Sequence, residues 1–86
     1  MKKRMNIDEF LKNKNLKDPK VLADCFFGLM QFYKEEGGLP DYLAILKSSV
    51  VLAKPFAGKE ELQDYEIDKY SRIVTAIVDG FYSLKN

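Results

Sequence analysis

Histidine is absent from this sequence, and cysteine occurs only once, as Cys25. Without histidine the chain lacks the commonest general base and the commonest imidazole metal ligand. A single thiol forms neither an internal disulfide nor a thiolate zinc site, and no carboxylate cluster has the spacing of a calcium-binding loop. The apolar neighbours of Cys25 would raise its pKa, so we interpret it as a buried structural residue. We expect no catalytic residue, no metal and no cofactor, and therefore no enzyme.

Long apolar runs and a phosphate-binding loop are also missing. The longest uninterrupted apolar runs are far too short to cross a bilayer. The basic start MKKRM is not followed by the apolar segment of a signal peptide, so we expect a cytoplasmic protein that does not enter membranes. The adjacent glycines Gly37 and Gly38 precede Leu-Pro instead of the Lys-Ser/Thr of a phosphate-binding loop.

The net charge is close to zero, at +1, which argues against a dedicated non-specific nucleic-acid binder. The charges are nevertheless segregated along the chain. Residues 1–20 hold seven basic and three acidic side chains, net +4, whereas residues 21–86 hold seven basic and ten acidic ones, net −3. We expect residues 1–5 to form a flexible basic tail.

The chain does contain apolar residues at helical spacing, and no strand pattern competes with them. A length of 86 residues and a hydrophobic content of 47% suit a single domain over residues 1–86 with one modest core. We therefore predict an all-α fold, a small three- to four-helix bundle. The first and shortest helix is NIDEFLKN, with Asn6 as its N-cap.

The second predicted helix, over residues 19–36, is the least amphipathic and should lie at the centre of the bundle. Asp18 suits its N-cap, Pro19 suits its first position, and the two glycines that follow Glu36 end it. Within it, the stretch DCFFGLMQFYKEEGG has apolar residues on nearly every side.

Two features of this stretch make specific predictions. We interpret Gly28 as a place where a neighbouring backbone comes close, because glycine otherwise weakens a helix. The face that carries Ala23, Phe27 and Met30 is covered either by other helices or by another chain. If Phe27 and Met30 are exposed, the protein is an interaction module; if they are buried, function lies in the charged surfaces.

The third and fourth predicted helices complete the bundle. The third begins near residues 39–41 and ends at Pro55, because a residue before proline is pushed out of the helical region. Its expected core positions are Leu39, Tyr42, Leu43, Ile45, Leu46, Val50 and Ala53, and its expected solvent side is Lys47, Ser48 and Ser49. The fourth, long and C-terminal, runs over residues 59–84, with Gly80 as a point of close contact.

An acidic run, KEELQDYEID over residues 59–68, carries the first candidate site. In a helix, Glu60, Asp64 and Asp68 would share one face. One interpretation is structural, because acids near a helix N-terminus complement its macrodipole and Asp68 can pair with Arg72. The other is a binding surface for a basic partner. The candidate partner-binding residues are Glu60, Glu61, Asp64, Tyr65 and Asp68.

These observations favour a non-catalytic helical protein–protein interaction module that uses the acidic and aromatic face. Its partner would be a larger protein, which the module regulates or inhibits, or a second copy in a homodimer. The alternative is a small DNA- or RNA-binding regulator whose Lys12, Lys14 and Lys17 contact phosphates. That alternative predicts binding that weakens steeply with salt.

Overall fold

A computed structural model describes residues 6–85, with side chains as far as residue 83, so the expected basic tail at residues 1–5 lies outside the described part. Four helices form the fold, and no strand occurs between residues 6 and 85: α1 (Ile7–Leu11), α2 (Pro19–Glu35), α3 (Asp41–Ala57) and α4 (Asp64–Lys85). The predicted all-α bundle with a long C-terminal helix is confirmed.

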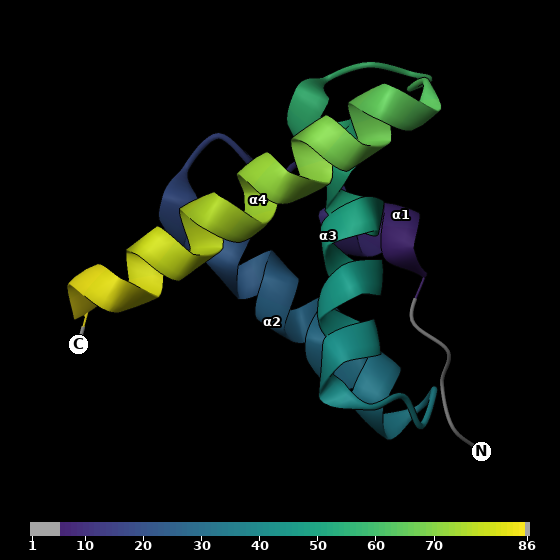
Figure 1. The fold of residues 1–86 in the computed structure, drawn as a ribbon, viewed down its shortest axis with the longest axis vertical. Coiled ribbons are helices and arrows are strands. Elements are labelled where there is room, and N and C mark those ends of the chain that lie inside the picture. Colours follow the sequence, from purple (N-terminus) through teal and green to yellow (C-terminus); the bar gives the residue numbers. More distant parts are fainter. Residues whose placement is uncertain (1–5, 86) are drawn as a thin grey trace.

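The three long helices pack against one another in all three pairs. Figure 1 shows α4 crossing the C-terminal half of α3 and then the N-terminal half of α2, while the short α1 lies behind α3. The core forms where these helices meet, and its fully buried members include Leu22 and Leu29 on α2, Leu52 on α3 and Val74 on α4.

The start of α2 follows the sequence prediction, whereas the role of its glycine differs from it. The carboxylate of Asp18 accepts a hydrogen bond from the Lys20 N–H at 3.0 Å, and Pro19 occupies the first helical position. A Cβ added at Gly28 would lie 2.8 Å from Cζ of Phe10. The group that approaches Gly28 is therefore an aromatic ring on α1, and the expected neighbouring backbone was wrong.

Helix α3 continues past the proline that we expected to end it. Pro55 lies inside the helix, which ends at Ala57. Proline removes only one backbone hydrogen bond at this position, close to the C-terminus, and Gly58 then closes the helix in the left-handed conformation, with φ of 72°. Its N–H bonds the carbonyl oxygens of Lys54 and Pro55 at 3.1 and 3.2 Å.

The buried and exposed faces of α3 differ from those predicted at most positions, although Ala53 is buried and Lys47 is exposed as expected. Ser48 and Ser49, expected in solvent, are buried, and the other buried members of this face are Ala44, Leu52, Ala53 and Phe56. Tyr42 is 70% exposed and Leu46 is 55% exposed. Small side chains let helix axes approach closely, so alanines and serines suit the face that packs against the neighbouring helices, where Leu52 and Phe56 are also buried.

Helix α4 begins five residues later than predicted. Gln63 is its N-cap, and the Glu66 carboxylate accepts a hydrogen bond from the Gln63 N–H at 3.2 Å, which is one half of a capping box. Residues 59–63 therefore lie outside the helix. Nothing lies within 4 Å of a Cβ added at Gly80, so the expected close contact there was wrong.

Candidate functional site

The five predicted partner-binding residues do not share one face. Asp64, Tyr65 and Asp68 lie in the first two turns of α4, whereas Glu60 and Glu61 precede the helix. The prediction that Glu60 continues a helical stripe was wrong, because the Glu66 cap fixes the helix start at a later residue. Glu60 and Glu61 line one groove and Asp68 lines another, whereas Asp64 and Tyr65 line neither of the two.

Two of the acids at the start of α4, Glu66 and Asp68, have structural partners. Asp68 accepts a hydrogen bond from Nε of Arg72 at 3.2 Å, so the predicted pairing is confirmed. Both side chains are largely exposed, and such a pair contributes little to stability. Glu66 contacts Nζ of Lys59 at 2.6 Å. This hydrogen bond lowers the pKa of Glu66, with a further lowering from the Gln63 N–H, and the same bond raises the pKa of Lys59.

The α1 groove is the larger of the two, with a volume of about 950 Å³. It lies between α1, the C-terminal half of α3 and the segment that leads to α4. Its apolar walls are Ile7, Leu11, Val50, Val51, Pro55, Leu62 and Ile67, and its charged residues are Asp8, Lys12, Lys54, Lys59, Glu60 and Glu61. Three cations face three acids, so the groove has no net charge and shows no preference for a ligand of either sign.

The α3–α4 cleft has a volume of about 670 Å³. From α3 it is lined by Tyr42, Ile45, Leu46 and Ser49, and from α4 by Asp68, Ser71, Arg72, Thr75, Ala76 and Asp79. One wall is therefore mainly apolar, and the other is mainly polar and charged.

The apolar wall belongs to a row of exposed residues along α3. The members of the α3 row are Tyr42, Ile45, Leu46 and Val50. Tyr42, Leu46 and Val50 stand four residues apart and Ile45 stands beside Leu46, so the four form a stripe along the helix. Sequence reasoning counted these residues as core because it assigned large apolar side chains to the interior. The run of small residues Ala44, Ser48 and Ala53 was the available signal that the other face packs inward.

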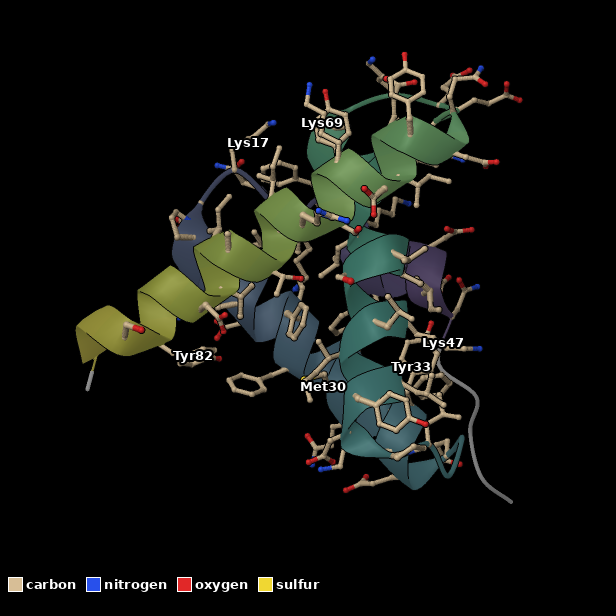
Figure 2. All side chains as sticks on the ribbon, in the orientation of Figure 1. Lys17, Met30, Tyr33, Lys47, Lys69 and Tyr82 are labelled. Atoms are coloured by element: carbon tan, nitrogen blue, oxygen red, sulfur yellow. The ribbon has the colours of Figure 1, made fainter. Side chains whose placement is uncertain are left out.

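The face of α2 that carries Ala23, Phe27 and Met30 is neither fully buried nor fully exposed. Ala23 is fully buried, Met30 is half-buried, and Phe27 is 48% exposed. The ring of Phe27 packs against that of Tyr82 with centroids 4.5 Å apart. In Figure 2, Met30 lies between Tyr82 and α3. With Gln31, Lys34 and Glu35, Phe27 and Met30 line a shallow hollow on α2, so this face is only partly covered by the chain itself.

Two of the three lysines of the nucleic-acid alternative lie over aromatic rings, and the third lines the α1 groove. Nζ of Lys17 lies 4.2 Å from the centroid of the Phe56 ring, and Nζ of Lys14 lies 5.9 Å from that of Phe10. Lys12 lines the α1 groove. Nucleic-acid binding stays a prediction, and retention on duplex or single-stranded nucleic acid at low salt would test it.

Cys25 is buried, as predicted, at 2% exposure. Burial raises the pKa of its thiol, with a smaller opposing effect from Lys14, so little thiolate forms near neutral pH. Among the described residues, no group of three or more His, Cys, Asp or Glu side chains could hold a metal ion. Within the same part of the chain, no helix has both the length and the apolar character needed to cross a bilayer.

Comparison with known proteins finds no relative. No family model matches the chain, and neither a curated protein sequence nor a solved structure is significantly similar to it.

Proposed function

We propose that this protein is a non-catalytic, cytoplasmic helical module that binds a larger protein and thereby regulates or inhibits it. The observation that carries the proposal is the α3 row, in which Tyr42 and Leu46 hold most of their surface in solvent beside an open cleft. Burial of one such side chain is worth about 1.5–3 kcal/mol, so a partner that covers the row gains several kcal/mol. Exposed apolar patches with a polar border are typical of protein–protein interfaces.

The acidic residues predicted from the sequence take a secondary place in this proposal. Asp68 borders the α3–α4 cleft and can orient a partner there. Tyr65 is 71% exposed and remains available as an aromatic anchor. Glu60 and Glu61 line the other groove, and Asp64 lies in the first turn of α4.

Affinity capture from an extract of the native cells tests the proposal. The tagged full chain serves as bait beside two variants, Tyr42→Ala with Leu46→Ala on α3, and Glu60→Lys with Glu61→Lys before α4. We expect quantitative mass spectrometry to show partners that are lost with the α3 variant and kept with the acid-reversed one. Circular dichroism checks that both variants remain helical. Equal recovery with the wild type and the α3 variant would contradict the proposal.

A further inference from the structure

The α3–α4 cleft has the dimensions of a binding site for one helix. Its α4 wall runs from Asp68 to Asp79, which at about 1.5 Å per residue is roughly 16 Å, or three helical turns. The cleft is bounded by α3 on one side and by α4 on the other, and grooves between helices receive an amphipathic helix in many protein complexes.

The charges around the cleft are not balanced. Its own cation, Arg72, is paired with Asp68 at 3.2 Å. On the neighbouring hollow of α2, Lys34 is paired with Asp41 at 2.8 Å. Two acids are left without a cation among the described residues, Asp79 in the cleft and Glu35 in the hollow.

This cleft surface, the cleft together with the α2 hollow and Asp41, therefore has four acids and two cations, net −2. The lysine nearest in sequence, Lys47, lies away from it, with Nζ 5.8 Å from the Tyr33 ring centroid. Figure 2 shows Lys47 and Tyr33 on the side of α3 away from Met30 and Tyr82. The acids are thus not neutralised by the rest of α3.

We propose that the cleft surface binds an amphipathic helix of a partner protein, one whose apolar ridge is flanked by lysine or arginine. The inference rests on the proposed function and names the partner's chemistry. The ridge covers Tyr42, Ile45 and Leu46 on α3, and the flanking cations reach Asp79 and Glu35. A second copy of this chain fits less well, because a contact of this surface with itself brings together two patches of net −2.

Two synthetic peptides of about 18 residues provide the probe. They share a leucine ridge at i, i+3, i+4 and i+7 spacing and an i,i+4 lactam bridge, since short free helices are marginal in water. One peptide has lysine at the flanking positions and the other has glutamate. Fluorescence anisotropy of each labelled peptide with the full chain gives the Kd. We expect the lysine peptide to bind and the glutamate peptide to bind at least about tenfold more weakly.

Matched charge reversals distinguish peptide binding at the cleft from a general effect of the protein's net charge. Glu35→Lys with Asp79→Lys should weaken the lysine peptide about tenfold and strengthen the glutamate peptide. Asp8→Lys with Glu61→Lys makes the same change in net charge on the α1 groove and should leave both affinities within about threefold. Ile45→Glu should weaken both peptides, because it removes part of the apolar wall.

Three results would overturn the inference. One is equal binding of the two peptides, and another is equal loss with the two charge reversals. The third is a dimer in sedimentation equilibrium that Ile45→Glu dissociates, because the cleft would then hold a second copy. Any of these results leaves the proposed function standing if cellular partners are still lost with Tyr42→Ala and Leu46→Ala, so the two failures are distinguishable.

Discussion

Helices α2 and α3 have the same length, seventeen residues, and both start beside a proline, yet they use apolar side chains in opposite ways. Helix α2 buries large residues such as Leu22, Phe26 and Leu29. Helix α3 places alanine and serine against its neighbours over much of its buried face and leaves Tyr42 and Leu46 exposed. Side-chain size at the helix crossing, in addition to hydrophobicity, decides which face of α3 is buried.

The same substitution on the two helices should give the largest contrast. Leu29→Ala removes a fully buried side chain and should lower the free energy of unfolding by about 2–5 kcal/mol. Leu46→Ala, on the α3 row, should change it by less than about 1 kcal/mol. Urea unfolding followed by circular dichroism measures both. Similar losses for the two variants would mean that Leu46 is buried in solution.

Enlarging a small residue tests the packed face of α3 directly. Ala44 is fully buried, so Ala44→Leu should overpack its surroundings and cost about 1–3 kcal/mol of unfolding free energy. Ala76→Leu, at an exposed position of α4, is the matched control and should stay within about 0.5 kcal/mol. Thermal unfolding of the two variants under identical conditions makes the comparison. A neutral Ala44→Leu would show that the helices do not meet closely there.

The two buried serines of α3 should respond differently to loss of the hydroxyl. Oγ of Ser48 has no hydrogen-bond partner among the described residues, and Oγ of Ser49 donates to the Leu46 carbonyl at 2.9 Å. An unsatisfied buried hydroxyl is unfavourable, so Ser48→Ala should raise the free energy of unfolding by about 1 kcal/mol. Ser49→Ala should bring no such gain. A loss with Ser48→Ala would indicate that its hydroxyl has a partner in solution.

The smallest difference in stability is expected between alanine substitutions at the two helical glycines, Gly28 and Gly80. Gly80 is exposed in α4 with open space around it, so Gly80→Ala should stabilise the fold by up to about 1 kcal/mol through helix propensity. Gly28→Ala should gain less, because the Phe10 ring has to move away from the new methyl group. Denaturant midpoints at unchanged m-value measure both changes. An equal gain at both positions would show that the Phe10 ring can move away from Gly28 without lowering the free energy of unfolding.

Local capping signals in the sequence predicted where α1 and α2 begin. Asn6 and Asp18 accept hydrogen bonds at the starts of α1 and α2, because a cap needs only residues within one turn. The late start of α4 could also have been predicted, because Glu66 stands three residues after Gln63, the spacing of a capping box. The orientation of α3 could not be predicted in this way. Both of its faces carry apolar residues at helical spacing, so the positions of α2 and α4 are needed to tell which face is buried.

The candidate site was predicted only in part for the same reason. Exposure of Tyr65 and pairing of Asp68 follow from their places near the end of a helix. The α3–α4 cleft joins residues of α3 to residues of α4 that are at least nineteen positions away in the chain, from Ser49 to Asp68, so periodicity within one helix could not reveal it.

The buried thiol has a practical consequence for measuring conformational opening. Cys25 is the only cysteine in the chain, and in the folded state its sulfur is shielded from solvent and held in the protonated form. A thiol-reactive reagent can therefore modify the native protein only when α2 separates from its neighbours. The rate of modification under native conditions reports how often the helices part, without an engineered cysteine or a denaturant.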